Sequence, residues 1–316
     1  MGTALALATR GVGRTAPNPP VGCVLIKDDR IVGRGWTQPG GRPHAEAGAL
    51  EQAGESARSA TAFVTLEPCA HVSPRGPACA DLLIAAGVAR VVIAAGDPDS
   101  RTNGAGIARL EASGIAVTLG PGKAEAERIM AGFLTRQRAG RPHVTLKLAM
   151  SLDGKIALAD GSSRWITGEE ARAHAHLERA RCDLIVVGRG TLEADAPRLD
   201  VRLPGLEDRS PQRAVLTRGV APEGWTGLAS PDSIAALEGV DEVLVEGGAG
   251  AAGAFLEADL VDRLLLYRAP ILIGDGSDAI RTLGLLDLAD AHGRWRLTDT
   301  RQLGSDRLDV YDRVRG

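Results

Sequence analysis

His44-Ala45-Glu46, followed by Thr65-Leu66-Glu67-Pro68-Cys69 and then by Cys79, is the part of this 316-residue sequence that decides the fold of its first half. The set supplies one imidazole, two thiolates and one further carboxylate. Three protein ligands leave the fourth position of a tetrahedral zinc open for a water molecule. Zinc lowers the pKa of that water to about 7, so hydroxide becomes available at neutral pH. Glu46 is then the candidate catalytic residue that carries a proton from the water to a departing amine.

The spacing of the two cysteines leaves alternatives open. Nine residues separate Cys69 from Cys79, whereas zinc nucleobase deaminases usually have two residues between their cysteines. Two unrelated buried thiols, a disulfide, or His71 as a rival ligand are the other interpretations. Four cysteines in the whole chain, without a recognisable secretory segment, argue against a disulfide framework. We therefore predict a zinc site formed by His44, Cys69 and Cys79.

Composition narrows the class of protein. Hydrophobic residues make up 44% and charged residues 24% of the chain, and the formal net charge is −3, which is typical of an ordinary globular protein. A basic excess that would attract nucleic acid is missing. The chain has two Tyr, three Phe and four Trp, so few aromatic side chains are available to stack on nucleic-acid bases. We expect a cytoplasmic protein with small-molecule substrates, because no apolar run approaches the ~20 residues of a membrane span.

The first part of the chain alternates between helical and extended patterns, which predicts a three-layer α/β unit. Met1–Ala8 is apolar, and we interpret it as part of the first helix rather than a signal peptide. Gly140-Arg141-Pro142 is the expected linker between domains 1–140 and 141–316. The expected strands are 21–26, 31–36, 62–66, 88–94 and 115–119, and the expected helices are 4–9, 45–53, 79–86, 107–113 and 123–138.

Two further features of the first half need an interpretation. Pro17-Asn18-Pro19-Pro20 fixes the backbone around Asn18 and presents its amide in a set direction, although a plain turn is an equal alternative. Cys23 lies inside an apolar strand, and Cys182 begins another in the second half. We interpret both as core thiols, because free cysteine is often buried.

The second half also reads as α/β. Strands are expected at 143–148, 182–187, 213–217, 242–245 and 264–272 and within 295–313, with helices over 169–180 and from the Gly247–Gly250 turn through Leu256. A glycine-rich turn at a helix start can bind phosphate, but many such turns are glycine-rich only for tightness, and this one lacks the dinucleotide fingerprint. Guanidinium groups suit phosphate, although most single arginines lie on solvated surface. The candidates are Arg164, Arg179 and Arg202.

Together these motifs resemble one family over nearly the whole chain: the bifunctional riboflavin-biosynthesis family, which joins a deaminase half to a reductase half. In the first half the resemblance rests on the zinc motifs together with Ala16-Pro17-Asn18-Pro19 and Val21-Gly22-Cys23-Val24. In the second half it rests on Lys147-Leu148-Ala149-Met150-Ser151-Leu152-Asp153-Gly154, Arg164-Trp165-Ile166-Thr167, Asp195-Ala196-Pro197 and Val245-Glu246-Gly247-Gly248.

The resemblance implies a fold and two reactions. It implies two three-layer α/β/α domains, the first cytidine-deaminase-like and the second dihydrofolate-reductase-like. The first would use one Zn²⁺ per chain to deaminate 2,5-diamino-6-ribosylamino-4(3H)-pyrimidinone 5′-phosphate. The second would use NADPH to reduce the ribosyl side chain to a ribityl chain. A homo-oligomer, dimer or tetramer, is expected.

The resemblance also implies roles for individual residues. His44, Cys69 and Cys79 would bind zinc and Glu46 would move the proton. Cofactor-binding positions would be Ala149, Trp165, Thr191, Asp195 and the turn and helix start Gly248, Ala249, Gly250, Ala251, Ala252, Gly253 and Ala254. Substrate-binding positions would be Asn18, Lys147, Ser163, Arg179, Leu199, Arg202 and Glu246.

The chain departs from the family pattern at three places. The family tends to carry Asp-Ser where this chain has Thr217-Arg218, the loop between Cys69 and Cys79 is one residue longer than usual, and the chain is somewhat short after Arg202. Three rival functions remain: a deaminase with an inactive or regulatory reductase-like half, a nucleic-acid deaminase, and a non-catalytic binding module. The second predicts a basic stripe with stacking aromatics, and the third would tolerate loss of Glu46.

Overall fold

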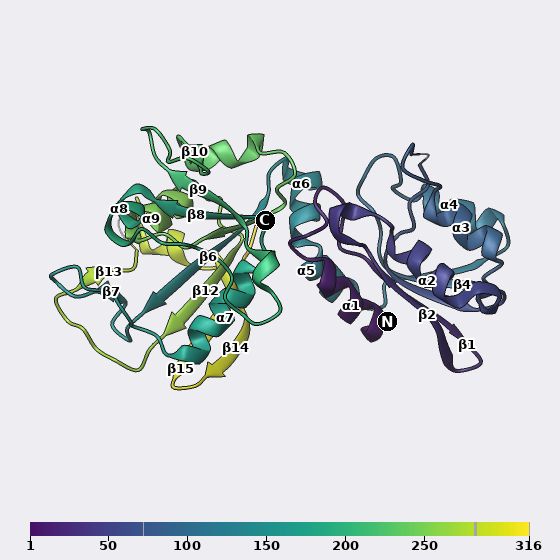
Figure 1. The fold of residues 1–316 in the computed structure, drawn as a ribbon, viewed down its shortest axis with the longest axis horizontal. Helices are drawn as coiled ribbons and strands as arrows, with labels where there is room; N and C mark the ends of the chain where they lie inside the picture. The colour runs from purple at the N-terminus through teal and green to yellow at the C-terminus, as the bar shows by residue number, and fades with distance from the viewer. Residues whose placement is uncertain (72, 281–282, 316) are drawn as a thin grey trace. The chain divides into compact units, whose positions relative to one another are not determined.

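A computed structural model describes residues 1–71, 73–280 and 283–315 of the chain. The chain divides into two compact units, unit 1 from Met1 to Gly140 and unit 2 from Arg141 to Gly316 (Figure 1). Within the described residues, none of the helices combines the length and the apolar character that crossing a membrane requires.

Unit 1 is built on a five-stranded mixed sheet. The first strand runs antiparallel to both of its neighbours, while the third, fourth and fifth run parallel to one another. Asp28 and Asp29, both with positive φ, form the tight turn between the first two strands, as hairpins of this kind require. Across the sheet the order is β2 (Arg30–Trp36), β1 (Gly22–Lys27), β3 (Thr61–Leu66), β4 (Arg90–Ala95) and β5 (Ala116–Leu119).

Helices cover both faces of this sheet at very close range. A Cβ on Gly22 would lie 1.9 Å from the carbonyl oxygen of Ala4 in α1, and a Cβ on Gly35 would lie 2.0 Å from that of Ala45 in α2. Glycine is therefore required at both positions, and α2 lies directly against the strands. The helices are α1 (Gly2–Ala8), α2 (Ala45–Ala53), α3 (Cys79–Ala86), α4 (Ala105–Ala112), α5 (Lys123–Ile129) and α6 (Ala131–Ala139).

The prediction of a single helix over 123–138 is wrong in one respect, because this segment forms two helices that meet at Met130. That residue has φ −98° and ψ 20°, yet the hydrogen bonds from the Met130 N–H to the Ala126 carbonyl and from the Leu134 N–H to the Met130 carbonyl persist across it. The break is thus a kink within a continuous run. The fully buried Met130 side chain belongs to the core of unit 1.

Unit 2 contains an eight-stranded sheet in which six neighbouring strands are parallel, the seventh runs antiparallel to them, and the eighth runs antiparallel to the seventh. Its order is β10 (Thr226–Leu228), β9 (Gln212–Leu216), β8 (Leu184–Gly188), β11 (Glu242–Val245), β6 (His143–Met150), β12 (Arg263–Arg268), β15 (Asp306–Arg313) and β14 (Trp295–Leu303). A separate pair joins β7 (Lys155–Ala157) to β13 (Ser277–Asp278). The strand expected over 264–272 ends at Arg268, because Pro270 shortly after it has no N–H for the sheet.

Two helices cover opposite faces of the second sheet. Helix α9 (Ala249–Glu257) buries Phe255 against the Val243 and Val245 side of β11. Helix α7 (Glu169–Arg179) packs against the face that carries Tyr267 of β12. A short helix, α8 (Arg189–Asp195), follows β8 directly. The 3₁₀ turns are Thr9–Gly11, Pro39–Gly41, Gly54–Ala57, Glu207–Arg209, Pro231–Ala236 and Leu288–Ala291.

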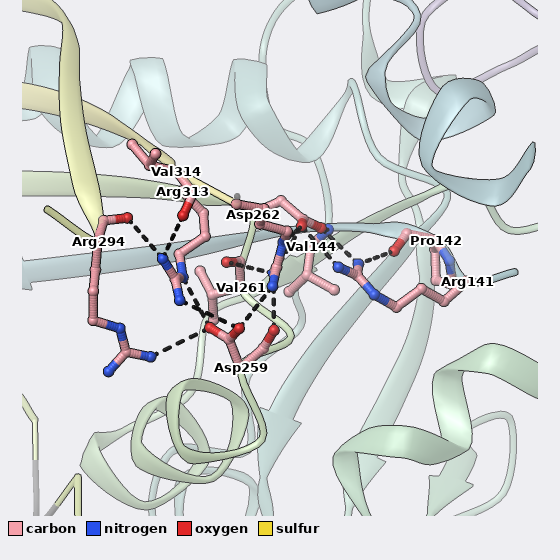
Figure 2. A network of polar contacts seen from close by, with 10 residues as sticks. Arg141, Pro142, Val144, Asp259, Val261, Asp262, Arg294, Arg313 and Val314 are labelled. Atoms are coloured by element: carbon pink, nitrogen blue, oxygen red, sulfur yellow. Dashed lines mark hydrogen bonds and ion pairs between the residues drawn. The ribbon is translucent and has the colours of Figure 1, made fainter. Parts of the chain in front are cut away.

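A network of arginines and two aspartates fastens the first residue of unit 2 to its C-terminal strand region. Figure 2 shows the Arg141 guanidinium against Asp262, with N–O distances of 2.7 and 2.8 Å. Asp259, three residues earlier, accepts hydrogen bonds from Arg313 and Arg315. Burial alone would raise the pKa of Asp262, but the Arg141 hydrogen bonds and charge, the His143 charge and the hydrogen bond from the Val144 N–H together outweigh burial, so the pKa is lowered. The carboxylate therefore stabilises unit 2 while it is ionised.

We predict that Asp262→Asn lowers the free energy of unfolding of unit 2 by about 2 kcal/mol at pH 7, because it leaves the largely buried Arg141 without its partner charge. The folded-state pKa of Asp262 lies below its unfolded value of about 3.9. The contribution is therefore present above about pH 4 and disappears as the pH falls through the folded-state pKa. Urea titrations at several pH values measure it. Asp278→Asn, which removes an exposed partner of Lys155, is the control and should leave the midpoint unchanged.

Candidate active sites

Three ligand atoms from separate elements of unit 1 meet at one point. His44 is the N-cap of α2, Cys79 is the first residue of α3, and Cys69 follows the end of β3. The His44 Nδ1 lies 3.3 Å from the Cys79 Sγ and 3.7 Å from the Cys69 Sγ, and all three atoms lie within 4.8 Å of one another. Tetrahedral zinc with the usual bond lengths separates nitrogen and sulfur ligands by about 3.5 Å. The cage therefore fits zinc.

The electrostatics of the cage favour a thiolate. Hydrogen bonding with Cys79 and, more weakly, with His44 lowers the pKa of the Cys69 thiol to about 4, against the opposing effect of burial. The backbone N–H of Cys79 donates to the Cys69 sulfur over 3.3 Å. The same sulfur–sulfur contact and burial raise the pKa of Cys79. Cys69 is therefore the sulfur that ionises first, and thiolate is the form that binds metal.

Glu46 is the carboxylate placed beside this cage. It lies in the first turn of α2, two residues after His44, and is 3% exposed. Burial raises its pKa, while the His44 charge partly opposes the rise. The Cys79 side chain also acts to lower this pKa, and the Cys69 charge to raise it. A buried carboxyl group whose pKa is raised can hold a proton and pass it on, which is the property a proton carrier needs.

The remaining candidates of unit 1 lie in the loops around the cage. Asn18 packs over Gly41, in the loop that leads to His44, so closely that a Cβ on Gly41 would lie 2.0 Å from the Asn18 amide nitrogen. The Nδ1 of His71, the rival ligand, is instead 3.4 Å from the Thr102 hydroxyl, and the His44–Cys69–Cys79 group does not include it. All four cysteines are free and buried, which rules out the disulfide alternative and agrees with Cys23 and Cys182 as core thiols.

In unit 2 the structure brings together a buried charge cluster. Arg179, at the end of α7, donates to both oxygens of Glu246 over 2.7 and 2.8 Å. The Lys147 Nζ, from β6, lies 3.9 Å from the same carboxylate. The Glu246 side chain is 6% exposed. Burial alone would raise its pKa, but the hydrogen bonds from Arg179 and the Lys147 charge outweigh burial and lower the pKa. Glu246 is thus an ionised carboxylate shared by two cations.

The segment after α8 joins this cluster. Arg179 donates to the backbone carbonyl of Asp200 over 3.1 Å, and the neighbouring Leu199, buried and with φ +56°, turns the chain there. The Arg202 backbone N–H donates to the His176 Nδ1 over 3.3 Å. The Arg202 guanidinium lies 3.5 Å from the Asp200 carboxylate, and the side chain is 55% exposed. These contacts connect four predicted substrate-binding residues of unit 2, and the Arg202 side chain is the most exposed of them. The four are Lys147, Glu246, Arg179 and Arg202.

The predicted cofactor residues lie at the ends of β8 and β11. The Thr191 hydroxyl accepts a hydrogen bond from the Gly248 N–H over 3.0 Å, which links the two strand-to-helix turns. A Cβ on Gly247 would lie 2.4 Å from the Ala251 Cβ, so glycine is needed there for tight packing. Of the predicted stretch, Gly250 is exposed, Gly248 and Ala254 are half-buried, and Ala249, Ala251, Ala252 and Gly253 are buried. Its exposed backbone at the start of α9 is the part that a phosphate can reach.

The other predicted positions of unit 2 come from separate parts of the chain, and most of them are less enclosed. The Trp165 ring is 66% exposed and is flanked by the guanidinium groups of Arg164 and Arg172, at 5.8 and 4.9 Å. Arg164 also contacts Asp195 over 3.4 Å. Ser163 is half-buried just before this arginine, and Ala149 is paired with Tyr267 between β6 and β12. Trp165 and Asp195 are therefore connected through Arg164.

Sequence reasoning missed several polar residues of both sites. His176 lies four residues after Arg172 and three before Arg179, a helical spacing that could have placed all three on one face of α7. Glu67 was quoted only as part of the cysteine motif, yet its carboxylate is buried and accepts four backbone hydrogen bonds. Asp97, just after β4, is buried, and burial raises its pKa to about 6.

Two family models match the chain, one in each unit. Residues 1–95 match the cytidine and deoxycytidylate deaminase zinc-binding region. Residues 142–224 and 233–308 match the RibD C-terminal domain. The riboflavin biosynthesis protein RibD of Escherichia coli is 41% identical, with 97% of this chain and 96% of that protein covered. The RibD of Mycobacterium tuberculosis is also 41% identical, with 98% and 95% covered.

This chain belongs to the RibD family. Solved structures agree with the assignment. Acinetobacter baumannii RibD is 36% identical, with a TM-score of 0.87 and 99% of this chain and 98% of that chain covered. The deaminase/reductase of Thermotoga maritima is 32% identical, with a TM-score of 0.90 and 99% and 97% covered.

Membership of the RibD family confirms the expected resemblance, the α/β fold class and the pairing of a zinc-dependent deaminase with an NADPH-dependent reductase. The alternative of an inactive or regulatory reductase-like half is not favoured. In unit 1, the zinc-binding family region and the geometry of the cage point to the same metal. In unit 2, the cofactor is NADPH and the buried charge cluster lies close to the turns predicted to hold it.

We predict that Cys79→Ser lowers the zinc content from one ion per chain to well below one, because a serine hydroxyl is a much poorer zinc ligand than a thiolate. Metal analysis of the purified protein measures this. Cys182→Ser makes the same atomic change at a buried thiol of unit 2 and should keep full zinc content. A Cys79→Ser protein with one tightly held zinc would contradict the proposed ligand set.

Proposed function

We propose that this chain catalyses two consecutive steps of riboflavin biosynthesis. Unit 1 would deaminate 2,5-diamino-6-ribosylamino-4(3H)-pyrimidinone 5′-phosphate. Unit 2 would then use NADPH to reduce the ribosyl side chain, giving 5-amino-6-ribitylamino-uracil 5′-phosphate. The observation that carries the proposal is the His44–Cys69–Cys79 cage with the buried Glu46 beside it. The two activities in the name of the Thermotoga maritima relative support it.

In unit 1 the chain's own residues would hold the metal and move the proton. Zinc, when bound, supplies a water molecule whose pKa is low enough for attack at neutral pH. Glu46 would accept a proton from that water at its carboxylate and deliver it to the amine that leaves the pyrimidine carbon. Its raised pKa suits a group that must take up and release a proton in one cycle. Asn18, packed against the loop that delivers His44, would orient the pyrimidine.

In unit 2 the buried cluster would hold the sugar and its charge. NADPH, when bound, supplies the hydride. The Lys147 ammonium, kept in place by Glu246 at 3.9 Å, would donate a proton to the carbonyl oxygen of the opened sugar. Arg202, whose guanidinium is exposed beside the cluster, would bind the substrate phosphate. A contact remote from the reacting carbon contributes binding energy for orientation.

One assay tests both steps. The diaminopyrimidinone phosphate is supplied with and without NADPH, and ammonia release and NADPH absorbance are followed together. We expect ammonia in both mixtures and NADPH oxidation only after ammonia begins to appear. Ammonia release with no NADPH oxidation would leave a deaminase whose second unit reduces nothing, and NADPH oxidation without ammonia would reverse the proposed order.

We predict that Glu46→Gln lowers the deamination rate by about 10²- to 10⁴-fold while zinc is retained, since general acid–base groups contribute about that much. Reduction of separately supplied deaminated substrate should be unchanged, because Glu46 belongs to unit 1. Glu51→Gln, an exposed change on the same helix, is the matched control. Deamination by Glu46→Gln at the wild-type rate would show that another group moves the proton.

We predict that Arg202→Ala raises the KM for the phosphorylated sugar about tenfold and the KM for NADPH much less, because a phosphate contact of the substrate is lost. Initial rates with each substrate varied in turn measure the two constants. Arg198→Ala is the control. Arg198, like Arg202, pairs with the Asp200 carboxylate, at 2.8 Å, but its side chain is 78% exposed. Equal effects of the two substitutions on the sugar KM would argue against a specific phosphate contact.

A homo-oligomer, dimer or tetramer, that works in the cytoplasm stays a prediction. Light scattering of the purified chain measures the first property and cell fractionation the second. Small-molecule substrates are supported by the family membership, since the relatives are enzymes of riboflavin biosynthesis.

A further inference from the structure

Glu67 is a buried carboxylate with an unusual set of partners. Glu67 is only 3% exposed. One oxygen, Oε2, accepts from the N–H groups of Asp97 and Gly104 over 3.3 and 3.1 Å. The other, Oε1, accepts from those of Gly106 and Ile107 over 2.9 and 3.2 Å. Four backbone donors from one segment thus stabilise one charge.

These hydrogen bonds connect two parts of unit 1. Glu67 starts the turn that ends at the zinc-site residue Cys69, whereas the four donors come from the loop after β4 and the first turn of α4. The two parts are also in tight contact, because a Cβ on Gly106 would lie 2.1 Å from the Pro68 carbonyl oxygen. The N-terminal end of a helix favours a carboxylate, so α4 and the loop are attached to the cysteine turn through Glu67.

The attached loop lies beside the metal site. Thr102, within the loop, contacts His71, two residues after Cys69, over 3.4 Å. Asp97, the first loop residue held by Glu67, is buried, and the Cys69 charge is among the charges that act on its carboxylate. Asp99 accepts hydrogen bonds from the Arg101 side chain. The Arg101 side chain is nevertheless largely exposed. The loop therefore presents polar side chains next to the cage without contributing a ligand to it.

We propose that Glu67 is a positioning residue of the deaminase, which holds the loop from Asp97 to Gly104 as a wall of the substrate pocket beside Cys69. The inference rests on the deaminase function proposed above. Zinc is held by residues at the starts of α2 and α3 and at the end of the cysteine turn, so the cage does not depend on this loop. Loss of the Glu67 charge should loosen the wall and weaken substrate binding, while metal and proton transfer persist.

The test is Glu67→Gln in the full-length enzyme. The amide keeps the size of the side chain, but its NH₂ group faces two of the four backbone donors and cannot accept from them. We expect one zinc per chain, hydrogen exchange of the amides from Asp97 to Ile107 that is about tenfold faster, and a KM for the diaminopyrimidinone phosphate raised about tenfold with kcat changed less than about threefold. Reduction of separately supplied deaminated substrate should be unchanged.

Two further variants make the result decisive. Glu111→Gln removes the same charge from an exposed position on α4 and should change none of these quantities. Gly106→Ala pushes the loop from the Pro68 side without altering the charge, and should give the same rise in KM. If Glu67→Gln does not accumulate as folded protein, the KM of Gly106→Ala tests whether the loop position controls substrate binding.

Two results would overturn the proposal. Loss of zinc from Glu67→Gln would show that Glu67 supports the ligand Cys69 rather than the pocket wall, and an unchanged KM with unchanged exchange would show that the loop holds itself. A wild-type enzyme that releases no ammonia from the diaminopyrimidinone phosphate would instead refute the proposed function. Zinc content and hydrogen exchange need no turnover, so the two failures are distinguishable.

Discussion

The deaminase centre depends on the close approach of α2 to the five-stranded sheet. Gly35 leaves no side chain between β2 and the helix, and a Cβ there would collide with the Ala45 carbonyl. The start of α2, with His44 as its N-cap, is therefore pressed against the strands, near the end of β3 where the cysteine turn begins. The three ligand atoms already lie at separations that suit zinc, so the geometry of the cage follows from packing.

A buried charge cluster shapes the proposed centre of the reductase unit. Glu246 is almost fully buried and is paired with Arg179 and Lys147. Taking charges out of water is costly, and removing one partner of such a pair leaves an uncompensated charge inside the protein. The cluster therefore constrains how β6, the end of α7 and the end of β11 lie relative to one another. The exposed Arg202, attached through His176, then has a defined place beside it.

Some parts of the fold could be predicted from the sequence, and others could not. The bounds of α2 and α3 were predicted correctly, because His44 and Cys79 follow non-helical residues and Gly54 and Gly87 end the helices. The kink at Met130 and the end of β12 at Arg268 were not, since neither changes the hydrophobic pattern. The role of Glu67 was also invisible, because its four partners are backbone N–H groups, which every residue except proline carries.

The sequence by itself determined the chemistry that this protein can hold: a histidine, two cysteines and a glutamate in one half, and arginines with Val245-Glu246-Gly247-Gly248 in the other. These are properties of residue type and local spacing, and they identified the family. Only the tertiary structure decided which residues share a site. His71 was excluded from the cage, and Arg179 was joined to Glu246 across 66 intervening residues. Such contacts come from sheet order and from helix packing against the strands, neither of which local sequence encodes.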